Sequence, residues 1–286
     1  MNETLNNALP IGVFDSGVGG LTVLNALMEL LPQEDYIYLG DTARLPYGTK
    51  SKETVINYSY NASLHLIERG IKLLVVACNT ASSCALETLQ SQFHPIPVIG
   101  VIQPSAQVAI EKQHQGPIAV IATEGTVKSR AYTQTILQLD PNREVIEWPC
   151  SLLVALAEEG WHEGPLVENI IDHILAPFWQ QLDHTEPKTL LLGCTHFPVF
   201  KNTIEKVLDK NTVVIDSAFS VAQAVMKLLK QSVLLNTQQK QGRIDYLVTD
   251  GIERFQRIAK FFLNKHHTLV QPELVELTFN TWCSVR

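Results

Sequence analysis

The sequence predicts an α/β protein with two similar, doubly wound parallel sheets that arose by internal duplication. Three observations lead to this prediction. Short apolar strands alternate with helical segments along the chain, as in βαβ units with right-handed crossovers. The apolar run at 73–77, which follows Lys72, is too short to cross a membrane and is typical of a strand buried on both faces. This run and its polar end then return at 190–198.

The first part of the chain alternates strands with helices. A glycine-rich turn follows the first strand, and Pro32 ends the first helix. Ser51 has the side chain of a helix N-cap, so we expect the second helix to begin there. The strands are expected at 11–14, 36–39, 72–77 and 98–102, and the helices at 21–31, 51–68 and 81–91.

The pattern then starts again. Residues 117–123 repeat the strand and turn of residues 10–16, and Cys194 lies 116 residues after Cys78. The same offset places Val98 on Val214 without a gap, and a repeat at a fixed offset indicates duplication. In this part we expect strands at 117–122, 145–146, 190–193 and 214–215, helices at 129–139, from 152 and from 166, and a final strand and helix between 244 and 262.

Composition and charge exclude several classes of protein. The chain has 286 residues, 45% of them hydrophobic and 18% charged, which is ordinary for a soluble protein. A formal net charge of −7 argues against nucleic acid as the main partner. No apolar stretch reaches the roughly 18 residues of a membrane span. Because the N-terminus also lacks the features of a signal peptide, we expect a cytoplasmic protein without a membrane partner.

The five cysteines indicate reduced thiols. They are odd in number and include no Cys-x-x-Cys pair, which disfavours a disulfide framework, a structural zinc site and a thiol-disulfide oxidoreductase. Cys84 is expected in the core, whereas Cys150 and Cys283 show no partner pattern. We assign no role to these three cysteines.

Cys78 and Cys194 stand at the carboxyl ends of equivalent strands, where ligands bind in open α/β sheets. If the two sheets face each other, the two thiols flank one ligand. A thiol has a reference pKa near 8.5, so a modest reduction of the pKa leaves some thiolate at neutral pH. One cysteine can then take a proton while the other gives one. The alternative for Cys78 alone is a buried cysteine before a helix N-terminus.

Two further side chains are candidate helpers of these thiols. Asp15 ends the first strand and can orient a thiol or a substrate ammonium group, although Asp15 and Ser16 are also typical helix caps. His196 follows Cys194 by two residues, so in an extended segment both side chains point to the same side. A nearby imidazole can hold or exchange the thiol proton. The alternative for His196 is a core histidine.

The polar strand ends predict a site for a carboxylate ligand. Gly17, Gly19 and Gly20 can direct backbone amides at an anion. Thr22 stands where a dinucleotide-binding fingerprint needs its third glycine, and there is no phosphate-binding P-loop. The side chains that can bind the carboxylates and the amine of an amino acid are Ser16, Asn79, Thr80, Thr123, Thr126 and Thr195.

Several segments resemble the bacterial glutamate racemases of the aspartate/glutamate racemase family. They extend over most of the chain in the order that the family has, and they are 14–21, 40–48, 77–81, 122–126 with Ser129 and Tyr132, and 193–198. The resemblance implies two α/β domains with the active site between them, and racemisation of glutamate without a cofactor or a metal. It also implies a first domain of residues 1–103 and 217–286 and a second domain of residues 104–216. D-glutamate for peptidoglycan is the implied cellular product.

The resemblance further implies roles for single residues. Cys78 acts on the α-proton of D-glutamate and Cys194 on that of L-glutamate, while Asp15 assists the first and His196 the second. The sequence departs from the family at 150–155, where prolines are common, although Glu158 keeps the acidic position that follows. The residues expected to hold the substrate are Asp15, Ser16, Tyr47, Gly48, Asn79, Thr80, Thr123, Thr126, Thr195 and His196.

Two other functions remain open at this point. A racemase of the same fold for aspartate or another amino acid differs in the room that loop 40–48 leaves for the substrate side chain. A non-catalytic amino-acid-binding protein needs only hydrogen-bond donors at the strand ends, so the matched cysteines argue against it. The sequence also leaves open whether the chain acts alone or as a homodimer.

Overall fold

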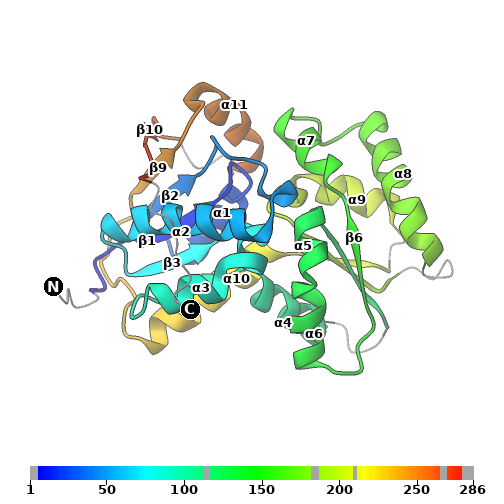
Figure 1. Ribbon diagram of the computed structural model, residues 1–286, viewed down its shortest axis with the longest axis horizontal. Coiled ribbons are helices and arrows are strands. Elements are labelled where there is room, and N and C mark those ends of the chain that lie inside the picture. The colour runs from blue at the N-terminus through cyan, green and yellow to red at the C-terminus, as the bar shows by residue number, and fades with distance from the viewer. Residues whose placement is uncertain (1–5, 113–115, 182–186, 209–210, 265–268, 279–286) are drawn as a thin grey trace.

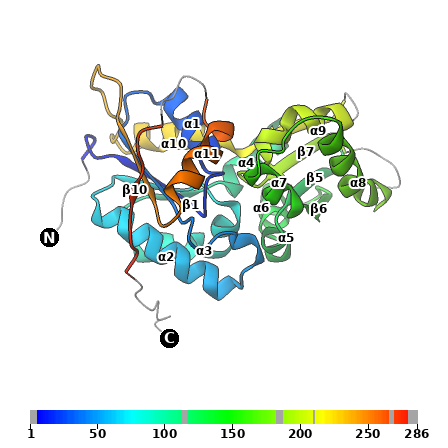
Figure 2. The same ribbon diagram turned by 90° about the horizontal axis from the view of Figure 1, so that it is seen from above.

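The computed structural model describes residues 6–112, 116–181, 187–208, 211–264 and 269–278. Two sheets lie side by side, each covered by helices, and they give the molecule two lobes (Figures 1 and 2). Every strand pair in both sheets is parallel. The predicted fold class, two doubly wound parallel sheets, is therefore confirmed.

The first lobe contains a six-stranded sheet with the order β10-β9-β2-β1-β3-β4. All residues of β1, β2 and β3 are buried, which explains why these strands are continuous apolar runs rather than alternating ones. The strands are β1 (Ile11–Asp15), β2 (Tyr36–Gly40), β3 (Leu73–Val76), β4 (Val98–Gly100), β9 (Ile244–Val248) and β10 (Glu273–Leu274).

The second lobe repeats the central part of this sheet. Its order, β6-β5-β7-β8, matches β2-β1-β3-β4 of the first lobe strand for strand. The same strand order in the same direction is what a duplicated βαβ unit produces. The strands are β5 (Ile118–Ala122), β6 (Val145–Pro149), β7 (Thr189–Gly193) and β8 (Val213–Asp216).

Helices connect the strands and cover both faces of each sheet. Ser51 caps α2 as expected, because its side chain accepts a hydrogen bond from the Thr54 N–H. The α-helices are α1 (Leu21–Leu30), α2 (Lys52–Glu68), α3 (Asn79–Gln92), α4 (Ile102–Lys112), α5 (Glu124–Ser129), α6 (Ala131–Leu139), α7 (Leu152–Glu158), α8 (Pro165–Gln181), α9 (Lys201–Val207), α10 (Ser217–Gln231) and α11 (Ile252–Phe262), and the short 3₁₀ helices are η1 (Tyr47–Thr49) and η2 (Phe197–Phe200).

Two helix boundaries differ from the sequence prediction. Helix α3 begins at Asn79 rather than at residue 81, because the Cys78 side chain accepts a hydrogen bond from the Ala81 N–H and acts as the N-cap. The helix expected at 129–139 begins two residues later, as α6 at Ala131, because Arg130 adopts a left-handed conformation with φ of 57° and separates it from the preceding helix α5, which the sequence did not predict. The first change places Asn79 within the helix that begins at the site.

The two lobes exchange a helix. Helix α4 follows β4 of the first sheet but packs against α6 and β7 of the second lobe, whereas α10 follows β8 and packs against α1 of the first. The two helices meet where the Ser105 and Ser220 hydroxyls lie 3.5 Å apart. The chain thus passes between the lobes twice at one place. The domain bounds at 103/104 and 216/217 stay a prediction, which this packing supports.

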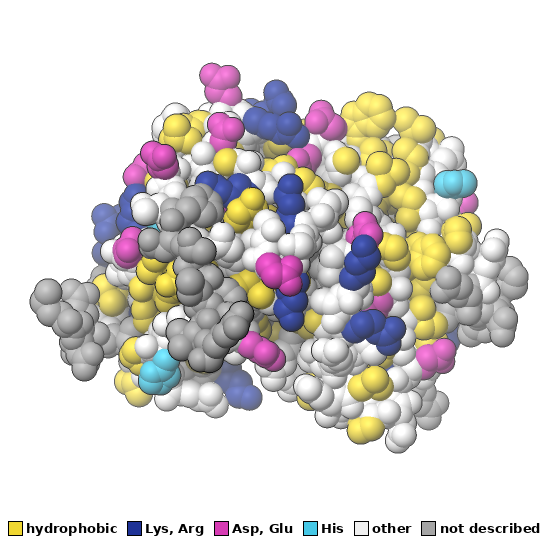
Figure 3. Space-filling model, in the orientation of Figure 1, with side chains coloured by type: hydrophobic (Ala, Val, Ile, Leu, Met, Phe, Trp, Pro, Cys, Tyr) yellow, Lys and Arg dark blue, Asp and Glu magenta, His cyan; other side chains and the backbone are white. Residues whose placement is uncertain are grey.

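The surface differs between the lobes. Leu152, Trp161 and Leu166 are exposed hydrophobic side chains of α7, α8 and the loop between them. Figure 3 shows hydrophobic side chains gathered over this part of the second lobe, at the upper right. Elsewhere on this face acidic and basic side chains are scattered among other residues (Figure 3). Among the described residues, no helix is both long and apolar enough to cross a membrane.

Candidate active site

The carboxyl ends of β1 and β3 in the first lobe and of β5 and β7 in the second meet at one cavity. Its volume is about 20 Å³, which is room for about one water molecule and too little for an amino acid. The cleft between the lobes is therefore closed, and a substrate has to open it. The cavity is lined by Ser16, Gly17, Leu45, Pro46, Tyr47, Gly48, Cys78, Asn79, Thr80, Thr123, Val154, Glu158, Cys194, Thr195 and His196.

Cys78 is a thiol in the closed cleft. It follows β3, caps α3 and is only 5% exposed. Burial, followed by the negative charge of Asp15, raises the pKa of Cys78 to about 12, although a hydrogen bond with Ser16 opposes this change. The expectation of a lowered pKa is therefore wrong for the closed cleft, because the thiolate loses its hydration there. The N-cap of α3 is thus Cys78 itself, rather than a residue after it as the alternative interpretation had it.

Asp15 lies fully buried at the end of β1. One of its oxygens accepts a hydrogen bond from the Gly17 N–H at 2.9 Å, and the other accepts one from the Thr195 hydroxyl of the second lobe at 3.4 Å. Burial raises the pKa of Asp15, while the His196 charge and these hydrogen bonds oppose it. Helix α1 has Gly20 as its N-cap without a side-chain hydrogen bond, so Asp15 does not cap this helix.

The glycines after β1 allow close packing around Asp15. A Cβ atom on Gly20 would collide with the Asp15 side chain, and one on Gly19 would collide with Thr195 and His196 of the other lobe. These glycines let the turn touch both the carboxylate and the opposite wall of the cleft. Close packing alone therefore explains why Gly19 and Gly20 are glycines, and the predicted role of their backbone amides in binding an anion is not needed to explain them.

Cys194 and His196 form a pair at the end of β7. The Cys194 Sγ lies 3.9 Å from the His196 Nδ1, and the His196 Nε2 lies 3.3 Å from a carboxylate oxygen of Glu158. Burial alone would lower the pKa of His196, but the hydrogen bonds with Cys194 and Glu158 outweigh burial and raise this pKa to about 10. His196 is therefore an imidazolium at neutral pH, a state that favours a neighbouring thiolate.

The local geometry of this pair differs from the prediction. His196 lies in a turn, with φ of −80° and ψ of −24°, and not in an extended segment. The turn folds the imidazole back over Cys194, so the predicted proximity holds for another reason. The core-histidine alternative also fails, because the His196 ring bonds two ionisable groups and lines the cavity.

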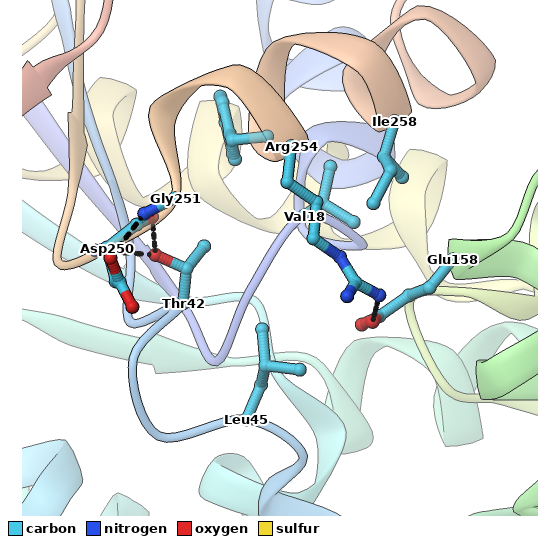
Figure 4. A pocket seen from close by; sticks show the side chains of 9 residues that line it. Val18, Thr42, Leu45, Glu158, Asp250, Gly251, Arg254 and Ile258 are labelled. Carbon is cyan, nitrogen blue, oxygen red and sulfur yellow. Dashed lines mark hydrogen bonds and ion pairs between the residues drawn. The ribbon is translucent and has the colours of Figure 1, made fainter.

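Glu158 extends this pair into a chain of contacts. Its second carboxylate oxygen accepts a hydrogen bond from Arg254 of α11 at 3.2 Å. Sequence reasoning noted the acid but found neither its contact with His196 nor any role for Arg254, since no local pattern links α7, β7 and α11. Arg254 and Glu158 both line a second cavity of about 190 Å³, and Leu45 lines it too. Figure 4 shows the side chains of Arg254 and Glu158 reaching toward each other.

Hydroxyl and amide groups from both lobes meet beside the thiols. The Thr80 hydroxyl lies 2.9 Å from that of Thr123 and 3.2 Å from that of Thr126. Thr126 does not line the cavity and bonds the two threonines from behind. The Asn79 amide donates to the Tyr132 hydroxyl at 2.8 Å, and its carbonyl oxygen is buried without a hydrogen-bond partner among the described residues. That oxygen can accept a hydrogen bond from a substrate ammonium group.

Loop 40–48 closes the cleft from the first lobe. The Tyr47 hydroxyl donates to the buried carboxylate of Asp41 at 2.7 Å, and Asp41 also accepts a hydrogen bond from Thr249 at 2.8 Å. A Cβ atom on Gly48 would lie 2.6 Å from the Thr123 Cβ. The backbone of Gly48 thus lies directly against the second lobe, and no larger residue would fit at this position.

The described cysteines are all free, and Cys150 is buried while Cys84 is partly buried. Cys283 lies outside the described residues. Within the described ranges, no group of three or more histidine, cysteine, aspartate or glutamate side chains could hold a metal ion. Among the described cysteines, Cys78 and Cys194 are the two whose thiols line the cavity.

Known proteins resemble this chain in sequence and in fold. A family model for Asp/Glu/hydantoin racemases matches residues 11–225. A glutamate racemase of Geobacter metallireducens is 47% identical over 254 residues, which cover 88% of this chain and 92% of that protein. The structure of a Francisella tularensis glutamate racemase with D-glutamate has a TM-score of 0.86 and 37% identity over 94% of this chain and 98% of its own. A Bacillus anthracis glutamate racemase isoform has a TM-score of 0.89 and 33% identity over 95% and 99%.

Proposed function

The chain belongs to the Asp/Glu/hydantoin racemase family, and from this premise we propose that it interconverts L-glutamate and D-glutamate with two cysteines as acid and base. The observation that carries the proposal is that Cys78 and Cys194 line the same cavity from equivalent strands of two duplicated lobes. Two such groups on opposite sides of an α-carbon are what inversion requires. The glutamate racemases that resemble this chain over most of their length support the substrate.

The reaction is a proton transfer on each face of the α-carbon. The thiolate of Cys78 removes the α-proton of D-glutamate, and the thiol of Cys194 donates its proton to the opposite face to give L-glutamate. The reverse reaction exchanges these roles. The hydroxyl groups of Thr80 and Thr195 line the cavity, where they can donate hydrogen bonds to the α-carboxylate and stabilise the negative charge that develops as the proton leaves.

The two thiols receive different help. Asp15 lies beside Cys78, and the imidazolium of His196 lies beside Cys194 with Glu158 behind it. With the pKa of Cys78 at about 12 and that of His196 at about 10, the closed cleft favours a Cys78 thiol on one side and a His196 imidazolium on the other. A Cys78 thiol is the form that donates a proton to the α-carbon when L-glutamate is inverted.

The Tyr47–Gly48 segment is proposed to bind the side-chain carboxylate of the substrate. Support comes from the place of this segment in the cavity wall and from its fixed position between Asp41 and Thr123. The side chain of aspartate is one methylene shorter, so its carboxylate would not reach the Tyr47–Gly48 segment.

We also propose that the protein acts in the cytoplasm and that the D-glutamate it makes is used to build peptidoglycan. The cysteines of the described residues are free thiols, as expected in a reducing compartment.

Polarimetry of the purified protein with D-glutamate and with D-aspartate, without added cofactor, tests the function. We expect loss of optical rotation with D-glutamate and a much slower loss with D-aspartate. The C78A/C194A double variant should be inactive, whereas C84A, which changes a cysteine of the same α3 helix outside the cavity, should retain the parent rate. Racemisation by the double variant at the parent rate would refute the two-thiol mechanism.

A further inference from the structure

The strand–helix unit β9–α11 is not part of the duplicated strands and helices, yet it contributes a contact to the site. Strand β9 extends the first sheet beyond β2, and no described strand of the second lobe extends β6 in the same way. Helix α11 lies next to α7 of the second lobe in both ribbon views (Figures 1 and 2). This unit therefore brings side chains of the first lobe to the Cys194 side of the cleft.

Arg254 in the first turn of α11 bridges the lobes. Its guanidinium donates to Glu158 at 3.2 Å and to the exposed Glu159 at 3.5 Å. The Arg254 side chain is 52% exposed, whereas that of Glu158 is 9% exposed. Figure 4 shows the guanidinium beside the Glu158 carboxylate, with a dashed line between the two groups. Three contacts then lead from the surface through Glu158 and His196 to the Cys194 thiol.

The two oxygens of Glu158 have separate partners. One contacts His196 and the other contacts Arg254, so the arginine determines how the carboxylate is rotated toward the imidazole. A half-exposed ion pair contributes little to folding stability. Its effect on a buried carboxylate that bonds a second group is geometric, and small errors in the position of catalytic groups are costly.

We propose that Arg254 is a positioning residue for proton transfer at Cys194, which holds Glu158 on His196 while the two lobes are closed. This inference rests on the racemisation proposed above. The cavity between the thiols is too small for an amino acid, so the lobes must separate for the substrate to bind, and separation breaks a contact between α11 and α7. When the lobes close again, the Arg254–Glu158 contact re-forms and holds Glu158 against His196 while Cys194 reacts.

The predicted effect is confined to one half of the reaction. Asp15, which assists Cys78, takes hydrogen bonds from Gly17 and Thr195 and has no direct contact with Glu158 or Arg254 among those that the described residues show. Two enantiomers have equal free energies in water, so any variant has the same kcat/KM in both directions. The asymmetry must therefore be read from isotope effects, because each enantiomer loses its α-hydrogen to a different thiol.

The experiment compares the parent, R254Q, R254K and E159Q with L-glutamate and D-glutamate that carry deuterium at the α-carbon. For R254Q we expect about a fivefold lower kcat/KM. The isotope effect with deuterated L-glutamate should rise, because transfer to Cys194 becomes slower, and that with deuterated D-glutamate should fall. R254K should recover part of the loss, and E159Q, which removes the exposed partner, should match the parent. R254Q should cost nothing further in an E158Q background.

Several outcomes would overturn the assignment of Arg254. One is an R254Q variant with the parent kcat/KM and isotope effects. Another is an equal change of both isotope effects, which indicates a general structural role, and a third is additive losses in the R254Q/E158Q double variant. A parent protein that does not racemise glutamate would instead overturn the proposed function itself.

Discussion

The two halves of the site occupy equivalent places in the fold but offer their thiols different surroundings. Cys78 follows β3 and Cys194 follows β7, which are matching strands of the two sheets. Beside Cys78 stands a buried carboxylate, and beside Cys194 stands an imidazolium supported by Glu158. Duplication thus accounts for the position of the thiols, while single residues outside the repeated pattern give the two thiols different neighbours.

This difference has a consequence for the resting protein. Burial and the Asp15 charge keep the proton on Cys78, whereas His196 offers a positive charge to Cys194. In the proposed mechanism Cys78 must lose its proton before it can act on D-glutamate. Changing each helper in turn should remove or strengthen this asymmetry.

The largest effect is expected from His196→Asn. Asparagine keeps a hydrogen bond near Cys194 but cannot carry the positive charge, and loss of a general acid or base costs about 10²- to 10⁴-fold in rate. We expect kcat to fall by about 10³-fold, with a larger isotope effect for deuterated L-glutamate than for deuterated D-glutamate. Steady-state kinetics with both substrates check this. A parent-like kcat would exclude His196 from the reaction.

The same imidazole predicts a dependence of stability on pH. The pKa of His196 is about 10 in the folded protein, above its ordinary value of 6.5, so its stabilisation is complete below pH 6.5 and is lost as pH rises through 10. We expect the parent to lose about 3 kcal/mol of unfolding free energy relative to H196N between about pH 6.5 and 9. Urea denaturation of both proteins measures this. Parallel pH profiles would contradict the raised pKa.

Asp15→Asn should change the other half of the site. Removal of the carboxylate charge lowers the pKa of Cys78 below its value of about 12, although burial remains. Racemisation should nevertheless fall by about 10²-fold, because the neighbouring carboxylate assists the proton transfer. Alkylation of Cys78 with iodoacetamide, followed by mass spectrometry across a range of pH, reports this pKa. Slower alkylation in D15N at every pH would contradict the assignment.

The smallest effect is expected from Tyr47→Phe. The change removes one hydrogen bond to Asp41, which is worth about 1 kcal/mol. Loop 40–48 would hold the substrate side chain less firmly, so KM for glutamate should rise about fivefold with little change in kcat. Kinetics in both directions test this. A lower kcat at unchanged KM would place Tyr47 in the proton transfer instead.

The sequence allowed the sheets, the matched thiols and the general place of the site to be predicted, because these features follow from apolar runs, strand ends and one fixed offset. The Glu158–His196 contact and the role of Arg254 could not be predicted, since they join α7, the end of β7 and α11, which are far apart in the chain. The pKa of Cys78 also escaped prediction. It depends on how completely the two lobes exclude water, and this is a property of the assembled fold.

The central claim is that each thiol acts on one enantiomer, and hydrogen exchange in deuterated water tests it most directly. Proton NMR would follow the α-hydrogen of L-glutamate and D-glutamate with C78A and with C194A. We expect neither variant to racemise, C78A to exchange only L-glutamate through Cys194, and C194A to exchange only D-glutamate through Cys78. Exchange of both enantiomers at similar rates by either variant would contradict the two-sided mechanism.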